Sequence, residues 1–243
     1  MGIEMLPPDI NEGDVGFSVA EEGIRYALPA IKGVGRNVIE AIVEEREARG
    51  KYKNLRDFVV RTADREVNKR AVENFIKAGA FDSLGGTRKQ LMSIYVQVME
   101  TTHNDRKSNM AGQMTLFDFA DEEEKENLEV ALPKNIGEYS EEMLLAFEKE
   151  VLGIYVSGHP LEEHEALWKK HITNKTTDFL WDDEEHSIGV EDGKKVTIGG
   201  MITDKKIKYT KNNQVMSFFN LEDLIGTVEV VVFPKTYEKC SEY

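Results

Sequence analysis

The sequence predicts a multidomain protein of mixed α and β class. Helical regions come first, and an incomplete antiparallel β-barrel ends the chain. Apolar residues recur at helical spacing between residues 28 and 103. A polar and acidic stretch then interrupts this pattern, and residues 191–243 contain three runs typical of strands. At 243 residues, with 40% hydrophobic residues, the chain can hold one or two domains with substantial cores.

The charge of the chain is concentrated in its middle. The net charge is −14, yet residues 1–110 contain 17 basic and 17 acidic residues, and residues 191–243 contain 8 of each. Residues 111–190 contain 6 basic and 20 acidic residues and account for the whole imbalance. The two ends are therefore neutral and can still carry local basic patches, so the overall acidity does not exclude a nucleic-acid partner.

Other patterns exclude several classes of protein. No apolar run approaches the roughly 18 residues that span a bilayer, and no signal peptide is visible at the N-terminus. Cys240 is the only cysteine, which excludes an internal disulfide and a cysteine-based zinc site. We therefore expect a cytoplasmic protein with no membrane partner.

We expect five successive regions. Residues 1–27 form the tail of a preceding domain, or an arm packed on the next one. Residues 28–103 form an all-α region, residues 104–137 a linker, residues 138–190 a small helical connector and residues 191–243 a partial β-barrel. In the connector, Met143, Phe147 and Val151 are expected to line one helix face, and a second helix is expected over 161–170. His159 lacks a second metal ligand at useful spacing and is expected to be a turn residue.

The strongest local pattern of the all-α region is a glycine hairpin followed by a helix. Apolar positions Val38, Ile39, Ile42 and Val43 predict a helix that starts near Arg36. Gly33 and Gly35 can take positive φ at little cost, which allows a tight turn before the helix. The free N–H groups at the start of the helix suit a phosphate. This is the pattern of a helix-hairpin-helix, and the residues expected to bind the DNA backbone are Lys32, Gly33, Val34, Gly35 and Arg36. The alternative is a glycine turn between packed helices.

A looser second hairpin is predicted after a helix over 67–80. Thr87 to Gln90 has capping-box spacing at the start of another helix. Arg88 and Lys89 lie in that first turn, where basic residues oppose the helix dipole unless an anion binds. We therefore expect Arg88 and Lys89 to contact a second backbone phosphate. A solvated basic turn is the alternative.

An apolar cluster interrupts the polar linker at residues 113–119. One interpretation is a short linear motif that docks an aromatic pair into a pocket of a partner protein. The alternative is a strap that folds back on a neighbouring domain of the same chain. Residues expected to make the partner contact are Gln113, Leu116, Phe117 and Phe119.

The last region predicts three antiparallel strands over 201–209, 215–221 and 228–233, followed by a helix from Pro234. Gly199 and Gly200 predict a bulge or coil. The order matches the first part of an OB-fold, a small five-stranded barrel. Charge beside stacking rings suits single-stranded nucleic acid, and the candidates are Lys205, Lys206, Lys208, Tyr209, Lys211 and Phe218. Alternatively the rings belong to the core and the lysines protect a sheet edge.

Taken together, these segments resemble the C-terminal part of the bacterial replicative DNA polymerase III alpha subunits, the C-family DNA polymerases. The resemblance rests on LPPDIN, IRYALPAIKGVG, VNKR with IKAGAFDSLG, GQMTLFDF, EKEVLGIYVSGHPL, and VTIGGMITDKK with LEDLIGTVEVVVFP. It implies that residues 1–27 end a fingers region, that a tandem helix-hairpin-helix holds duplex DNA, and that the 113–119 motif binds a sliding clamp. It also implies single-stranded template near the OB region and further holoenzyme subunits as partners.

The resemblance also implies that this segment is a fragment without catalytic residues. No Asp-x-Asp pair in a strand setting is present to hold catalytic metal ions. We expect no cofactor here, and Mg²⁺ for the parent DNA-directed DNA polymerase at an upstream site. Two alternatives remain: a non-catalytic helix-hairpin-helix and OB factor of DNA repair, or an RNA-binding OB protein.

Overall fold

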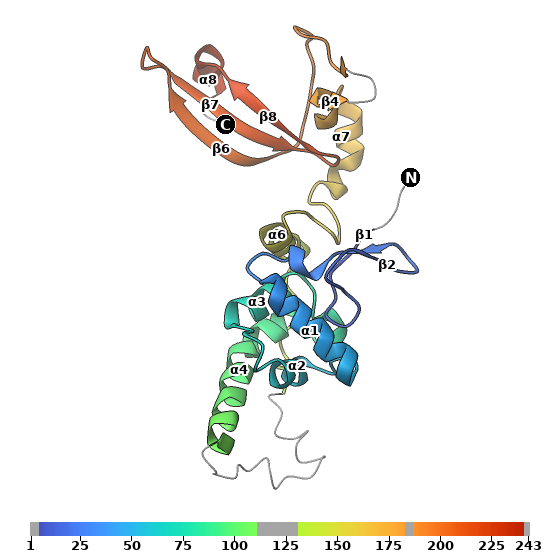
Figure 1. Ribbon diagram of the computed structural model, residues 1–243. Coiled ribbons are helices and arrows are strands. Elements are labelled where there is room, and N and C mark those ends of the chain that lie inside the picture. Colours follow the sequence, from blue (N-terminus) through green and yellow to red (C-terminus); the bar gives the residue numbers. More distant parts are fainter. Residues whose placement is uncertain (1–4, 111–130, 183–186, 241–243) are drawn as a thin grey trace. The chain divides into compact units, whose positions relative to one another are not determined.

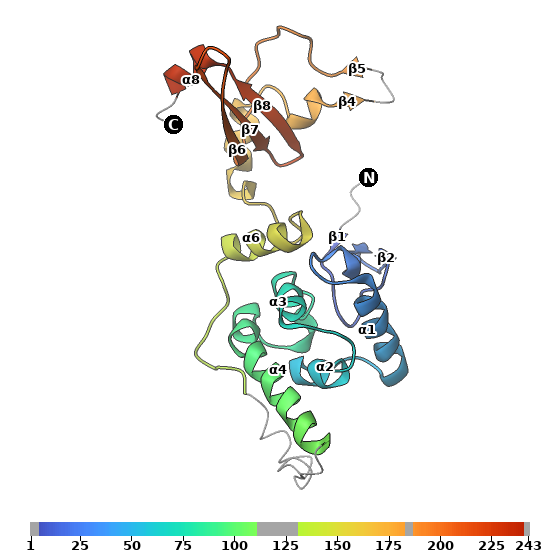
Figure 2. The same ribbon diagram turned by 60° about the vertical axis from the view of Figure 1, so that its left-hand side comes forward.

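The computed structural model describes residues 5–110, 131–182 and 187–240. These residues belong to two compact units, Met1–Gly158 and His159–Tyr243 (Figures 1 and 2). No helix in the described ranges is long and apolar enough to cross a membrane.

The first unit is predominantly helical, as the sequence predicts. In the described part of this unit, the short strands are β1 (Met5–Leu6), β2 (Ser18–Val19) and β3 (Ile24–Arg25), with β3 between the other two. The helices are η1 (Leu28–Ala30), α1 (Arg36–Arg49), α2 (Leu55–Arg61), α3 (Lys69–Lys77), η2 (Asp82–Leu84), α4 (Arg88–Met110) and α6 (Glu141–Leu152). Figure 2 shows α3 among the other helices, and it packs against both α4 and α6.

Three aromatic rings lie at the centre of the first unit. Phe58, Phe75 and Phe81 are fully buried, and their ring centroids are 4.9 to 5.9 Å apart. Burying each ring stabilises the fold by about 1.5–3 kcal/mol. Ile10 is also fully buried and its N–H donates to the carbonyl of Ala80 at 2.8 Å. The segment around Ile10 therefore packs onto the helices and shares their core.

Side-chain caps explain where several helices begin. Asn54 accepts a hydrogen bond from the N–H of Asp57, and Asn68 accepts one from the N–H of Ala71. At α4, the Thr87 N–H donates to the Gln90 side chain at 2.8 Å, and the Gln90 N–H donates to the Thr87 hydroxyl at 3.1 Å. The predicted capping box is present.

Two predicted boundaries of the helical regions are wrong. Helix α4 continues to Met110, so the residues from 104 that we expected in the linker are helical. The first unit extends to Gly158, because Val151 and Leu152 of α6 lie in its core. The buried face of α6 also differs from the prediction, since Leu145 and Glu148 are buried while Met143 is 45% exposed.

The second unit contains an open antiparallel sheet in the order β6-β7-β8. Its elements are η4 (Glu162–His164), α7 (Glu165–His171), η5 (Thr176–Phe179), β4 (Trp181–Asp182), β5 (Ser187–Ile188), β6 (Met201–Tyr209), β7 (Val215–Glu222), β8 (Thr227–Val232) and α8 (Pro234–Cys240). The helix predicted over 161–170 is instead a 3₁₀ turn followed by α7. No closed barrel forms within residues 187–240, which confirms the predicted incomplete β region.

The glycine pair before β6 has a different role from the predicted bulge. The register shift lies between Ile202 and Asp204, further along the strand. A Cβ on Gly200 would lie 2.2 Å from the carbonyl oxygen of Glu222. Gly200 is therefore required because the backbone of β7 passes too close for a side chain.

Candidate nucleic-acid interface

The first candidate site is the hairpin between η1 and α1. Ile31 and Val34 are buried in the core, while Gly33 and Gly35 are exposed between and beside them. Gly33 has φ of +77°, a conformation that a side chain would strain. We expected both glycines to use this freedom, but Gly35 has φ of −70° and serves as the N-cap of α1. The hairpin is thus anchored by its apolar side chains and presents its glycine backbone outward.

The first turn of α1 favours an anion. It contains no acidic residue, and the first N–H groups of a helix lack partners within the helix. The positive end of the helix dipole adds to this preference. The Arg36 side chain is 73% exposed and pairs with Glu40 one turn later, with 3.0 Å between Nε and Oε1. An exposed ion pair of this kind contributes little and leaves Arg36 available to a ligand.

Lys32 joins the hairpin to the end of α6. Its N–H donates to the carbonyl of Val151 at 2.8 Å, and its Nζ donates to the carbonyl of Glu150 at 3.0 Å. On the other side, the Asn74 amide of α3 donates to the Lys32 carbonyl at 2.6 Å. Asn74 is buried and fixes the hairpin against α3. The sequence did not predict this contact, because 42 residues separate the two partners.

The second predicted phosphate site is occupied by the chain itself. The Glu138 carboxylate accepts the N–H of Arg88 at 2.8 Å and the N–H of Lys89 at 3.1 Å. These are N–H groups in the first turn of α4, the place where we expected a DNA phosphate. The helix start does bind an anion, as its dipole favours, but the anion is a side chain 50 residues further along.

The side chain of Arg88 is also committed to the fold. Its guanidinium contacts Asp82 at 2.9 Å and Glu148 at 3.3 Å, and Arg88 is only 7% exposed. Glu148 is fully buried and also accepts the N–H groups of Val156 and Ser157. The prediction that Arg88 contacts DNA is therefore wrong for this structure. Lys89 remains exposed, with its Nζ 5.6 Å from the ring centroid of Tyr139.

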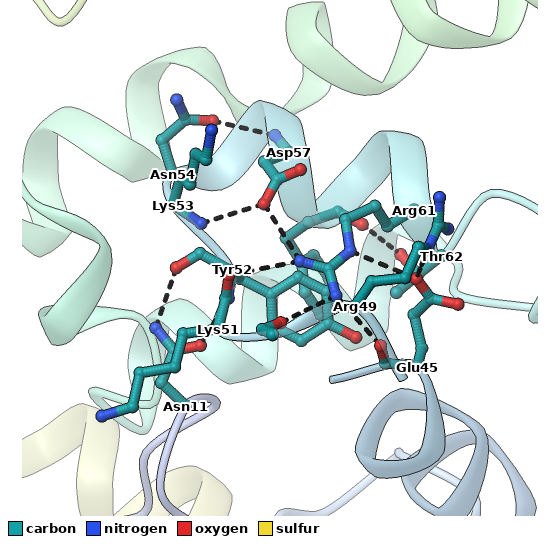
Figure 3. Close-up of polar contacts among 12 residues, drawn as sticks. Asn11, Glu45, Arg49, Lys51, Tyr52, Lys53, Asn54, Asp57, Arg61 and Thr62 are labelled. Carbon is teal, nitrogen blue, oxygen red and sulfur yellow. Dashed lines mark hydrogen bonds and ion pairs between the residues drawn. The ribbon is translucent and has the colours of Figure 1, made fainter. Parts of the chain in front are cut away.

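At the far end of α1, a polar network holds the connection to α2 (Figure 3). The Arg61 guanidinium donates to Glu45 Oε1 at 3.2 Å and to the Gly50 carbonyl at 2.8 Å. It also lies over the Tyr52 ring, 4.2 Å from its centroid. Burial raises the pKa of Tyr52 to about 12, and its hydroxyl donates to the Ile42 carbonyl at 2.8 Å. These groups therefore stabilise the junction between α1 and α2.

The β-sheet divides the candidates for single-stranded nucleic acid between its two faces. Lys206 pairs with Phe218 across β6 and β7, so both side chains share a face with Lys208. The Lys208 Nζ lies 4.8 Å from the Phe218 ring centroid. Lys205 and Tyr209 belong to the opposite face of β6, and Lys211 lies in the turn that follows. The structure therefore groups three of the six candidates on one face.

Other predicted positions lie elsewhere. Gln113, Leu116, Phe117 and Phe119 fall outside the described residues. His159 accepts the N–H of Leu161 on its Nδ1 at 3.1 Å, as a turn residue does.

Comparison with known proteins identifies relatives along almost the whole chain. Residues 2–91 match the model of the helix-hairpin-helix motif. DNA polymerase III subunit alpha of Aquifex aeolicus is 40% identical over 99% of the chain, and that of Borreliella burgdorferi is 36% identical over 98%. The chain matches one segment of the DNA polymerase III alpha subunits. The predicted resemblance is thereby confirmed. The subunit of Deinococcus radiodurans is also 36% identical over 98% of the chain.

These matches bear on the site in two ways. The chain spans 18–20% of the length of these curated relatives, so it corresponds to a small part of each. The helix-hairpin-helix match includes Gly33, Asn74 and the start of α4, but it ends at Leu91. Glu138, which fills the start of α4, therefore lies outside the matched motif.

Proposed function

We propose that this chain binds the phosphodiester backbone of duplex DNA through Gly33, Val34, Gly35 and Arg36, as part of a DNA polymerase III alpha subunit. The observation that carries this proposal is the hairpin itself. Its apolar residue Val34 is buried, its glycine backbone is exposed, and the following helix starts without an acidic residue. Such a surface contacts phosphates and reads no bases, so it suits an enzyme that must hold any sequence.

A pair of glycine variants tests the proposal. Gly33 and Gly50 both have positive φ, +77° and +81°, so alanine strains the backbone at both. Only at Gly33 would the new Cβ meet the hairpin support, 3.0 Å from the Asn74 amide, whereas nothing lies within 4 Å at Gly50. We expect Gly33→Ala to weaken duplex binding several-fold in fluorescence anisotropy, and Gly50→Ala to leave it unchanged. Equal affinities for both variants would refute the hairpin assignment.

We further propose that the larger protein synthesises DNA on a template and uses Mg²⁺ at a site outside this chain. The named relatives support this proposal, since each is a DNA polymerase III alpha subunit over a much greater length. The expected result is that the 243-residue chain alone incorporates no nucleotide. Incorporation that survives removal of every contaminating polymerase would contradict it.

Tethering to a sliding clamp by Gln113, Leu116, Phe117 and Phe119 is a separate part of the proposal. Its support is the pattern of a glutamine, a leucine and two phenylalanines within a polar and acidic stretch. The double variant Leu116→Ala with Phe117→Ala should abolish binding to a bacterial clamp in surface plasmon resonance. The control Leu128→Ala with Val130→Ala, which lies in the same acidic stretch outside 113–119, should retain binding. Equal binding by the two double variants would contradict the motif.

A role of the sheet in holding single-stranded template rests on Lys206, Lys208 and Phe218. These residues share one face, and Lys208 already lies over the Phe218 ring. Stacking with a base is typically worth about 1–3 kcal/mol by alanine substitution. Phe218→Ala should therefore weaken single-strand binding without changing duplex binding, while Tyr209→Ala on the other face should change neither.

A further inference from the structure

A recess lies beside the hairpin and is not part of the hairpin backbone. It has a volume of about 510 Å³. It is lined by Lys32 of the hairpin, by the face of α3 that carries Arg70, Asn74 and Lys77, and by Glu150 at the end of α6. Neither the helix-hairpin-helix pattern nor the basic first turn of α4 predicts a site here. The recess brings together segments that lie far apart in the sequence, from Lys32 to Glu150.

Two of the cations at this recess are already neutralised. Lys77 lies 3.0 Å from Glu73 and 2.9 Å from Glu150, and Lys69 lies 2.6 Å from Glu100. Lys77 thus shares one positive charge between two carboxylates, but the four cations that line the recess outnumber its two carboxylates.

Lys32 and Arg70, the other two cations at the recess, form no such ion pairs with the described residues. Within the described ranges, neither Lys32 nor Arg70 has a carboxylate within ion-pair distance. Lys32 gives one hydrogen bond to a carbonyl and retains two further N–H donors. Arg70 is exposed and carries five donors in a planar fork. The recess therefore has unsatisfied positive charge, and its donors suit a phosphate.

Arg70 stands next to the hairpin glycine. A Cβ built on Gly33 would lie 3.5 Å from Arg70 Nε and 3.0 Å from the Asn74 amide nitrogen. Arg70 and Asn74 are four residues apart on α3, so they lie on the same face of the helix. One turn of α3 thus fixes the hairpin through Asn74 and places a guanidinium beside it through Arg70.

We propose that this recess is a second phosphate subsite, which takes the phosphodiester adjacent to the one on the hairpin, in the same DNA strand. Arg70 is its principal ligand and Lys32 Nζ the second. The proposal rests on the proposed duplex binding and extends it to α3. Two neighbouring phosphates held from two elements fix the direction of the strand, which one hairpin cannot do alone.

Salt titration of duplex binding by the full chain tests the subsite. Removing one phosphate-binding charge reduces the slope of log K against log salt by about 0.9 for B-DNA. Arg70→Gln should lower the magnitude of the slope by about one, and Arg70→Lys should weaken binding while retaining the slope. Lys89→Gln is the matched control, since it removes one exposed charge from another first helical turn and should leave slope and affinity unchanged.

The outcomes separate this proposal from the one on which it rests. If the wild-type chain shows a salt slope and Arg70→Gln retains it, the subsite is wrong and the hairpin proposal stands. If the wild-type chain binds duplex without salt dependence, both are wrong. Free inorganic phosphate should compete with DNA for the recess, and should therefore weaken duplex binding by wild type more than by Arg70→Gln. Equal weakening of duplex binding in the two proteins would also overturn the subsite.

Discussion

The starts of α1 and α4 offer the same backbone chemistry in different surroundings. Both are preceded by glycines, both have basic residues in the first turn, and neither has an acidic residue there. The start of α1 is open, with Arg36 exposed, whereas the start of α4 is filled by the Glu138 carboxylate and Arg88 is buried. A helix start with an affinity for anions therefore identifies a ligand site only when the chain supplies no anion of its own.

The largest expected effect on stability concerns Arg88, the buried arginine at the start of α4. Arg88→Met removes one partner of a buried ion pair and leaves Glu148, which is fully buried, without its counter-charge. Such changes typically cost about 3–5 kcal/mol. Arg36→Met should cost less than about 0.5 kcal/mol, because it alters an exposed pair. Urea unfolding followed by circular dichroism compares the two, and equal midpoints would contradict a structural role for Arg88.

Sequence alone was sufficient for features whose partners are close in the chain. The hairpin at Gly33, the capping box at Thr87 and the three long strands depend on residues within a few positions of one another. Glu138 was not predicted to cap α4, because 50 residues separate it from Arg88 and no periodic pattern links them. Asn74 was missed for the same reason.

Lys89 shows why the sequence could not decide what binds at the start of α4. A basic residue in a first helical turn signals an anion, but the sequence does not reveal which anion. Only the folded chain shows that Glu138 accepts the N–H groups of both Arg88 and Lys89.

The second unit contains another carboxylate that accepts hydrogen bonds from backbone N–H groups, as Glu138 does at the start of α4. Here the N–H groups belong to a turn. Asp223 is buried and accepts the N–H groups of Thr176, Ile225 and Gly226 and the hydroxyl of Thr176, all at 2.8–2.9 Å. Although burial alone would raise the pKa of Asp223, these hydrogen bonds lower it below its usual value. Asp223→Asn should cost about 1–3 kcal/mol, since the amide nitrogen cannot accept from a donor.

The same carboxylate predicts a pH dependence. Because its pKa is lower in the folded protein, Asp223 stabilises the fold at pH values above its unfolded pKa, near about 4, and this contribution is lost as pH falls through the folded pKa. Both tryptophans, Trp168 and Trp181, lie in the second unit and report its unfolding. Tryptophan fluorescence at about pH 7 and about pH 3 should show a smaller stability difference for Asp223→Asn than for wild type. An unchanged difference would contradict this role of Asp223 in the turn.

A smaller effect concerns Glu138 itself. Glu138→Ala removes the cap of α4 and should cost about 0.5–2 kcal/mol, as loss of an N-cap does. It should also expose an anion site, so added inorganic phosphate should raise the melting temperature of this variant more than that of wild type. Glu47→Ala, an exposed residue of α1, is the control for the charge change. If phosphate stabilises all three proteins equally, Glu138 does not occupy an anion site.

The most direct test of the open and filled helix starts is a paired salt titration of duplex binding with Arg36→Gln and Lys89→Gln. Each variant removes one exposed positive charge from a first helical turn, so any general electrostatic effect is the same for both. We predict that Arg36→Gln lowers the magnitude of the salt slope by about one and that Lys89→Gln leaves it unchanged. Equal slopes for the two variants, or a larger loss for Lys89→Gln, would contradict the assignment of DNA binding to the open start of α1.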